Sequence, residues 1–342
     1  GEETVSSRQA FDLLDLAQIA RREERTRRYF QQATDFRDYA AALDGTEFLA
    51  RFQDFLKMYG HRANYETDWS LPRFAEDPSP LLFTIASHVR AETCPSSAEV
   101  RARREEEAAQ VWQAFEDRLS PWQKRFLLPR VRKALDQMKR LYIWRELNRS
   151  ESVRVAAAMR RYSLTLARRC AERGWIETEQ DYYFLLLDEI RPAILNAGAG
   201  SDRFRSLVAR RRAEQAAWSR LEMPLVMRES ELPALIRQAT RALPEAAIQR
   251  LEGQCISTGW AEGEVVVLHA PTEFARMKPG AILVAPATDP SWTPLFTLAT
   301  GVIVEIGGVG SHASTVAREY GLPAVANVRD ATRLLRTGDR VR

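Results

Sequence analysis

A glycine-rich turn with a single histidine is the most informative part of this sequence. Residues 307–325 read GGVGSHASTVAREYGLPAV. The apolar run at 301–306 predicts a buried strand before the turn, and a helix is predicted after it, ending at Gly321. Free backbone N–H groups and the positive end of the helix dipole favour an anion at such a helix start. Our central hypothesis is therefore that His312 carries a phosphoryl group.

The chemistry of this turn supports the hypothesis without excluding a simpler one. A neutral imidazole is a good nucleophile near pH 7. Ser311 offers a hydroxyl or a helix cap, and Arg318 pairs with a phosphate or forms a surface ion pair with Glu319. The glycines that let backbone approach phosphate oxygens are Gly307, Gly308 and Gly310. On these residues alone, a structural histidine with satisfied hydrogen bonds is the safer interpretation.

Composition indicates a helical chain followed by a smaller mixed domain. Ten of the sixteen glycines lie in the last 90 of the 342 residues, and only six lie in residues 1–220. The predicted fold class is therefore α plus α/β: a helical domain at 1–220, a linker at 221–252 and a β/α domain at 253–342. Helices are predicted at 6–29, 35–43, 46–58, 81–91, 97–117, 131–173, 177–190, 202–219, 231–243, 295–299, 312–321 and 329–335. Another helix is predicted to begin at residue 121, and the stretch 131–173 is either one very long helix or a broken one. The predicted strands are 264–269, 281–285, 301–306, 324–328 and one that begins at 338–341.

Bulk properties narrow the functional class. The net charge of +4 comes from 50 basic and 46 acidic residues, which is typical of a densely charged helical surface, so we expect no nucleic-acid partner. No run approaches 18 apolar residues, and the polar start gives no signal peptide, so we expect no membrane association. The three cysteines fit neither a metal spacing nor a disulfide framework, which predicts a cytoplasmic protein without a metal site of its own. The absence of an initiator Met suggests a processed chain or a fragment.

A polar loop at 61–78 is the second unusual stretch. It begins with His61 and Arg62 and mixes basic, acidic and aromatic side chains around two prolines. Long ordered loops of this kind often carry function. A surface loop held by its own ion pairs is an equally good interpretation.

Several motifs resemble the phosphoenolpyruvate-utilising enzymes, and within them the rifampin phosphotransferases. The turn and helix at 307–325 are similar to the phosphohistidine signature of the swivelling domain in that family. Residues 279–296 (PGAILVAPATDPSWTPLF) are similar to the rifampin branch, as are YGHR at 59–62 and PRFAEDP at 72–78. A further match is Arg145-Glu146-x-x-Arg149 in the long helix. The likeness spans nearly the whole chain and is most specific at 253–328.

The resemblance implies a phosphotransfer relay. A nucleotide-binding ATP-grasp domain would phosphorylate His312 from ATP, releasing AMP and phosphate, and the histidine would swing to deliver the phosphoryl group to an acceptor on the helical domain. Arg145, Glu146 and Arg149 would then lie near the acceptor hydroxyl, with both arginines on one helix face. Substrate-binding roles are implied for His61, Arg62 and Trp144. An apolar acceptor cavity is also expected, and its candidate lining residues are Trp112, Phe126, Tyr142 and Trp144. A place in the hydrophobic core is an equally good interpretation of these four residues.

Three departures from the family pattern bear on that expectation. Arg149 stands where the family usually has Lys, and Arg cannot accept a proton. Gly310 replaces the usual leucine or threonine before Ser-His. Residues 1–342 contain no recognisable ATP-grasp domain, so ATP and Mg²⁺ are expected on a missing domain or a partner subunit.

The sequence thus predicts a phosphotransferase component that phosphorylates a small-molecule hydroxyl, as in antibiotic resistance. One alternative is an enzyme that activates a carboxylate for ligation or condensation in natural-product biosynthesis. Another is a non-catalytic binding or regulatory module that has kept the fold.

Overall fold

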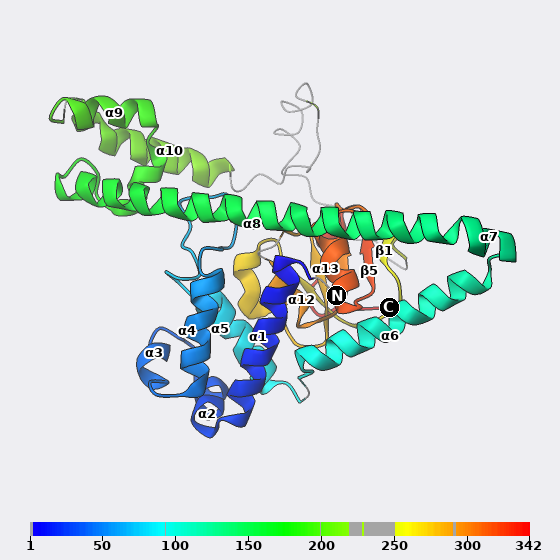
Figure 1. Ribbon diagram of the computed structural model, residues 1–342. Helices are drawn as coiled ribbons and strands as arrows, with labels where there is room; N and C mark the ends of the chain where they lie inside the picture. Colours follow the sequence, from blue (N-terminus) through cyan, green and yellow to red (C-terminus); the bar gives the residue numbers. More distant parts are fainter. Residues whose placement is uncertain (1–2, 93, 199, 219–227, 229–249, 290–291) are drawn as a thin grey trace. The chain divides into compact units, whose positions relative to one another are not determined.

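The computed structural model describes residues 3–92, 94–198, 200–218, 228, 250–289 and 292–342 (Figure 1). The chain divides into two compact units. The first contains residues 1–67, 71–154 and 248–342, and the second contains residues 68–70 and 155–247. The predicted linker at 221–252 and the helix predicted at 231–243 fall almost wholly outside the described residues, so that part of the domain division stays a prediction.

A cluster of helices around an aromatic core begins the first unit. Its rings include Phe30, Phe36, Phe48 and Phe52, each at most 2% exposed. The helix predicted at 6–29 is wrong in one respect, because the backbone at Glu23 is extended (φ −84°, ψ 111°) and the Glu23 carboxylate instead accepts from Thr26. The helices are α1 (Val5–Arg22), α2 (Glu24–Gln32), α3 (Tyr39–Ala42), α4 (Glu47–Tyr59) and α5 (Ser79–Arg90).

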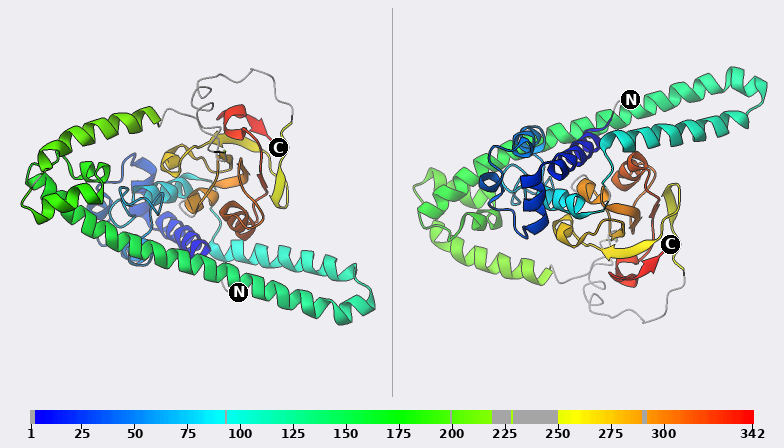
Figure 2. Two further views of the ribbon diagram at one scale, coloured as in Figure 1. Left: turned by 90° about the horizontal axis from the view of Figure 1, so that it is seen from above. Right: turned by 90° about the horizontal axis from the view of Figure 1, so that it is seen from below.

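Three further helices form a long hairpin. They are α6 (Ser97–Asp117), α7 (Pro121–Phe126) and α8 (Leu128–Glu172). Ser96 and Ser120 each close a capping box, which fixes where α6 and α7 begin. Figure 2 shows α6 running alongside the first part of α8. Arg132 of α8 joins the two arms, since it pairs with Glu116 at 2.5 Å and lies over the Trp112 ring of α6. The uninterrupted α8 settles the choice left open for 131–173. Neither it nor any other described helix is long and apolar enough to cross a membrane.

The second unit continues α8 into a small helical cluster. It adds η1 (Glu179–Phe184), α9 (Leu187–Leu195), η2 (Ser201–Arg203) and α10 (Phe204–Trp218). The single helix predicted at 177–190 is wrong, because the backbone at Leu185 and Leu186 is extended and separates η1 from α9. Pro192 lies inside α9, beyond the predicted helix end at Ile190. The two units share α8, and the predicted site residues all belong to the first unit.

A six-stranded mixed sheet forms the C-terminal part of the first unit. Its order is β1-β5-β4-β3-β2-β6, with β5, β4, β3 and β2 parallel and the two edge strands antiparallel. The strands are β1 (Gln254–Ser257), β2 (Gly263–Val267), β3 (Ala281–Ala285), β4 (Ala299–Val304), β5 (Ala324–Ala326) and β6 (Arg340–Val341). The connecting helices are η4 (Pro271–Arg276), α12 (Thr293–Phe296), α13 (His312–Tyr320) and α14 (Ala331–Leu334).

The predicted α plus α/β class is confirmed, with two local corrections. The short helix predicted at 295–299 begins at Thr293 and ends at Phe296, because Ala299 already pairs in the sheet. Strand β1 was not predicted, although it forms the antiparallel edge beside β5. The central strands are apolar on both faces, as expected for buried parallel strands.

One hydrophobic cluster joins the sheet domain to the helices of the same unit. Phe11 and Leu14 of α1 and Val100 of α6 share this cluster with Val316 and Tyr320 of α13. The Phe11 and Tyr320 ring centroids are 5.5 Å apart. The helix α13, whose first residue is His312, is thereby held next to α1 and α6.

Candidate functional site

Local capping fixes the position of His312 at the start of α13. Ser311 is the N-cap residue, with extended backbone (φ −71°, ψ 165°), and its hydroxyl accepts from the Ser314 N–H at 3.3 Å. The helix ends at Gly321, whose left-handed backbone (φ 62°) suits glycine. The predicted cap and the predicted helix end are both confirmed. His312 is consequently the first residue of a well-defined helix that follows the turn after β4.

The His312 ring lies in a pocket of mixed character. Its Nε2 is 3.4 Å from the Thr293 hydroxyl, and its edge meets the Phe296 ring with centroids 5.9 Å apart. Burial lowers the pKa of His312 well below its ordinary value, and the charges of Arg62, Arg149 and Arg145 lower it further. The imidazole is therefore neutral at pH 7, which is its nucleophilic form.

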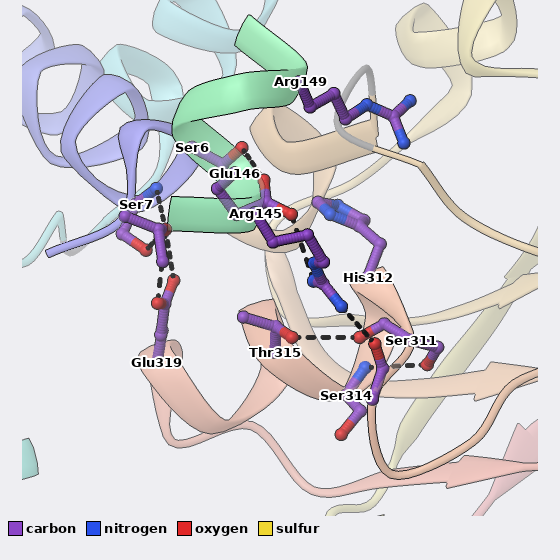
Figure 3. Close-up of polar contacts among 12 residues, drawn as sticks. Ser6, Ser7, Arg145, Glu146, Arg149, Ser311, His312, Ser314, Thr315 and Glu319 are labelled. Atoms are coloured by element: carbon purple, nitrogen blue, oxygen red, sulfur yellow. Dashed lines mark hydrogen bonds and ion pairs between the residues drawn. The ribbon is translucent and has the colours of Figure 1, made fainter. Parts of the chain in front are cut away.

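One residue of α8, Arg145, reaches the turn that carries His312, and its neighbour Glu146 contacts α1 (Figure 3). Arg145 donates from Nη1 to the Gly310 carbonyl at 2.8 Å and from Nη2 to Glu146 at 3.1 Å. Glu146 is buried, and its second oxygen accepts from the Ser6 hydroxyl of α1 at 3.1 Å. A helix of the N-terminal part and the turn before α13 thus meet through a basic side chain.

A buried ion-pair network continues from α8 into the loop at 61–78. Arg62 donates from Nε to Glu66 at 2.7 Å and from Nη2 to Ser6 at 3.3 Å, and Nη1 also contacts Gln9. The other Glu66 oxygen accepts from Arg149 at 3.3 Å. The loop is therefore held by its own ion pair, as one interpretation predicted. The same pair also lies close enough to act on His312, since Arg62 lowers the pKa of its ring.

The structure places the predicted residues in two groups. It brings His312, Arg62, Arg145, Glu146 and Arg149 into one polar cluster. Of the other seven, Gly310 accepts from Arg145 through its carbonyl and Ser311 caps α13, as described above, and the remaining five lie apart from the cluster. His61 Nε2 meets the Ser150 hydroxyl at 3.2 Å, Arg318 donates to the Val309 carbonyl at 3.1 Å, and the Gly307 N–H donates to Asn327 at 3.3 Å. Gly308 has open space where a side chain would begin, and Trp144 is 67% exposed.

His61 differs from His312 in its setting although both are neutral. Burial lowers the pKa of His61 to about 4, and the nearby charges of Arg154 and Arg62 add to that effect. Its ring nitrogen contacts the buried Ser150 of α8. His61 thus joins the polar loop to α8, and a contact with substrate stays a prediction.

Sequence reasoning missed four residues that complete the cluster. They are Ser6, Gln9, Glu66 and Thr293. The first three are buried polar residues, and each is hydrogen-bonded to a predicted residue, either Glu146 or Arg62. Ser6 and Gln9 lie more than 50 positions from their partners, so no local spacing marked them. Glu66 was visible as an acidic residue four positions after Arg62, a spacing that suits an ion pair.

The four aromatic residues proposed for an apolar acceptor cavity line neither of the two cavities described below, so that cavity stays a prediction. The two cavities described for the structure, of about 720 and 430 Å³, have other lining residues. The first belongs to the second unit and includes Trp69, Tyr183 and Trp218; the second lies beside Tyr59. Phe126 is 49% exposed, so it is not a core residue of the helical part.

Metal and nucleotide sites were expected outside this chain. Across the described ranges, no group of three or more His, Cys, Asp or Glu residues could hold a metal ion. The two buried carboxylates of the polar cluster, Glu66 and Glu146, are occupied by Arg62, Arg149, Arg145 and Ser6. These residues therefore do not fit a Mg²⁺ site, and ATP with Mg²⁺ on another domain remains a prediction.

Comparison with known proteins identifies both parts of the first unit. Residues 1–146 match the family model described as the rifampicin phosphotransferase fourth domain, and residues 277–342 match the PEP-utilising enzyme mobile domain. The chain belongs to the PEP-utilising enzyme family. His312 lies within the segment that matches the mobile domain of these enzymes.

The similarity to PEP-utilising relatives extends over nearly all of this chain. It is 32% identical to the rifampicin phosphotransferase of Streptomyces sviceus and 28% identical to that of Bacillus subtilis, in each case over 99% of the chain. It is 29% identical over 84% of its length to the prodigiosin synthesizing transferase PigC of Serratia marcescens. The chain spans about two fifths of the length of the two rifampicin phosphotransferases and 32% of PigC.

Proposed function

We propose that this chain is the carrier and acceptor part of a phosphotransferase, with His312 as the residue that holds the phosphoryl group. The observation that carries the proposal is one hydrogen-bonded network that contains Arg62, Arg145 and Arg149 and reaches the His312 turn, where Arg145 donates to the Gly310 carbonyl at 2.8 Å. The three charges also lower the pKa of the His312 ring. A neutral imidazole among fixed cations suits a histidine that bears a dianionic group.

The charge balance of the cluster favours an incoming phosphoryl group. Three arginines and two carboxylates, Glu66 and Glu146, leave one positive charge before a phosphoryl group is present. A phosphoryl group would bring about two negative charges. Because the guanidinium groups are already held by hydrogen bonds, they would stabilise the transferring group without reorganising first.

The proposed transfer step uses residues of this cluster. An acceptor hydroxyl oxygen attacks phosphorus, and the phosphorus–nitrogen bond to His312 breaks with its electron pair returning to the ring. Glu146 takes the hydroxyl proton, since it is the buried carboxylate beside Arg145. Arg145 and Arg149 hold the phosphoryl oxygens. Arg149 contributes charge only, because a guanidinium does not accept a proton.

Charging of His312 would take place on another domain. We propose an ATP-grasp domain or subunit that binds ATP with Mg²⁺ and releases AMP and phosphate as the histidine is phosphorylated. The swivelling domain would then carry the group to the position described here. This chain's own residues hold the histidine neutral and receive it on α8.

Two acceptor classes have separate support. The names of the relatives favour a small-molecule hydroxyl, as in rifampicin, and a role in antibiotic resistance. The likeness to the prodigiosin synthesizing transferase favours natural-product biosynthesis, in which a carboxylate would be activated for condensation. The same arginine cluster serves either acceptor, because both reactions move a phosphoryl group away from His312.

Phosphoryl labelling tests the carrier role. The native full-length protein, or this chain with its ATP-grasp subunit, is incubated with ATP labelled at the β- or the γ-phosphate. We expect acid-labile, base-stable label from the β-phosphate on wild type and none on His312→Ala. His269→Ala is the control and should label like wild type. Equal label on wild type and His312→Ala would contradict the proposal, and no label on either would favour the non-catalytic module.

The labelled protein then separates the two acceptor classes. Chase with rifampicin should move the label to the drug if a hydroxyl is the acceptor. Chase with a carboxylic acid and an amine should release labelled phosphate with formation of a condensed product if a carboxylate is activated.

A further inference from the structure

The turn before His312 fits against one side chain of α8. A Cβ atom built at Gly310 would lie 3.0 Å from the Tyr142 hydroxyl oxygen, closer than an ordinary van der Waals contact. Gly310 does not have the left-handed backbone that itself favours glycine. A side chain at position 310 would therefore need the Tyr142 hydroxyl to give way by a few tenths of an ångström. Position 310 is also the position at which the sequence departs from the family motif.

Tyr142 also holds the arginine that bonds to this turn. The Arg145 guanidinium lies 4.9 Å from the centroid of the Tyr142 ring, within the range of a cation–π contact. The same guanidinium donates to the Gly310 carbonyl at 2.8 Å. Tyr142, Arg145 and Gly310 thus form one contact group, in which the ring supports the guanidinium and the hydroxyl faces the glycine.

A purely structural role does not account for Tyr142. It is half-buried and belongs to none of the hydrophobic clusters that the described residues form. Arg145 is 45% exposed at its side chain, so it too contributes little to the core. Both side chains instead contact the turn that leads into His312.

We propose that Tyr142 is a positioning residue that holds the His312 turn against α8. Its hydroxyl occupies the space that a side chain at position 310 would need. This inference rests on the proposed function, since it concerns where the carrier histidine is held for transfer. Its consequence is that a larger residue at position 310 lifts the turn away from Arg145. Reducing Tyr142 in size restores the fit.

The test follows His312 itself and needs neither ATP nor an acceptor. The ring of His312 is titrated by NMR in the full chain, with His312→Ala, His61→Ala, His88→Ala and His269→Ala used for assignment. In the wild type it should titrate well below 6.5, because burial and three arginines hold it neutral. Gly310→Leu should move its pKa toward 6.5, since the ring then loses that environment.

The double variant decides between fit and general damage. Tyr142→Ala combined with Gly310→Leu should bring the His312 pKa at least halfway back to the wild-type value. Tyr142→Phe should stay close to wild type because the ring is kept. Tyr162→Ala, a 71% exposed tyrosine of the same helix, is the matched control and should change nothing.

Two results would overturn the proposal: an unchanged His312 pKa in Gly310→Leu, or a double variant no better than Gly310→Leu alone. Circular dichroism confirms that each variant folds, and Gly310→Ala, with a smaller shift in the same direction, replaces any variant that does not. The titration also separates this proposal from the previous one. Failure of phosphoryl labelling would remove the carrier role and leave the fit between Tyr142 and Gly310 to be decided by the NMR result.

Discussion

Glu66 of the polar loop accepts a hydrogen bond from Arg149 of α8 at 3.3 Å, although the two residues are 83 positions apart. The Glu66 side chain is 1% exposed, and its other oxygen holds Arg62 at 2.7 Å. One buried carboxylate therefore keeps two of the three guanidinium groups around His312 in place. The polar loop and α8 are two halves of one site for this reason.

Replacement of that carboxylate is the first test. Glu66→Gln should lower the free energy of unfolding by about 3 kcal/mol, because removing one partner of a buried pair leaves the other charges uncompensated. Urea unfolding followed by circular dichroism measures the change. Glu151→Gln is the matched control, since Glu151 pairs with Arg154 at 3.1 Å on the surface; it should cost less than about 1 kcal/mol. Equal losses in the two variants would contradict a central role for Glu66.

Arg149 should act on His312 through its charge. Arg149→Met should raise the pKa of His312 toward its ordinary value, because one of the cations that disfavour the imidazolium is removed. Arg149→Lys should keep most of the lowering. NMR titration of the His312 ring measures both. Arg140→Met, which removes an exposed arginine of the same helix, should leave the titration unchanged.

The contact between α13 and α1 should make stability depend on pH. The Thr4 hydroxyl donates to the two Glu319 carboxylate oxygens at 3.3 and 3.4 Å. Burial raises the pKa of Glu319 to about 7. Arg104 and Thr4 lower this pKa, whereas Glu146 and Glu3 raise it further. A carboxyl whose pKa is higher in the folded state contributes stability that is complete below about pH 4.5 and is lost as the pH rises toward 7.

The Glu319 contribution is isolated by a difference measurement. The free energy of unfolding of the wild type minus that of Glu319→Gln should fall by on the order of 1–3 kcal/mol between pH 4.5 and 7.5. The subtraction removes the effect of buried His88, which is present in both proteins. Because the pKa of His88 is lowered to about 4, His88 destabilises the folded protein as the pH falls below 6.5, which is opposite to the effect of Glu319. A flat difference across this range would show that Glu319 is not buried in the folded protein.

Phe11 should hold the sheet domain against the helices. Its side chain is fully buried between the Tyr320 ring and the Arg101 guanidinium, which lies 4.3 Å from the ring centroid. Phe11→Ala should cost about 3–5 kcal/mol in thermal or urea unfolding. Trp122→Ala, at a 68% exposed position of α7, should cost less than about 1 kcal/mol. A small loss for Phe11→Ala would mean that the shared cluster does not form in solution.

Local signals in the sequence were sufficient for the element that carries His312. Ser311, Gly321 and the apolar strands give caps and periodicity within a few residues, so the bounds of α13 and of β3 follow from them. The break at Glu23 was not predictable in that way. It depends on Glu47 and Phe48, whose N–H groups bond to the Glu23 carboxylate from more than twenty positions away.

The candidate site was predictable in two ways. The glycine turn and the helix start pointed to His312, and the family motif added Arg145, Glu146 and Arg149. Ser6, Gln9 and Glu66 were not predictable, because a buried polar residue is recognised by its partners, and those partners are distant in sequence. The 67% exposure of Trp144 was not predictable either, because an exposed tryptophan and a buried one look alike in a helical pattern.

The hydrophobic cluster that contains Phe11, Leu14 and Val316 has a kinetic consequence for the proposed relay. A carrier domain whose hydrophobic core is shared with the helical part must expose those side chains to water each time it moves away from that part. Departure then has an activation barrier that rises with the apolar area uncovered, so the domain rests in this position and visits the site of charging briefly. The turnover of such an enzyme would be limited by release of the domain. Substitutions that weaken contacts at the edge of the cluster would then raise the turnover rate before they lowered the stability of the fold.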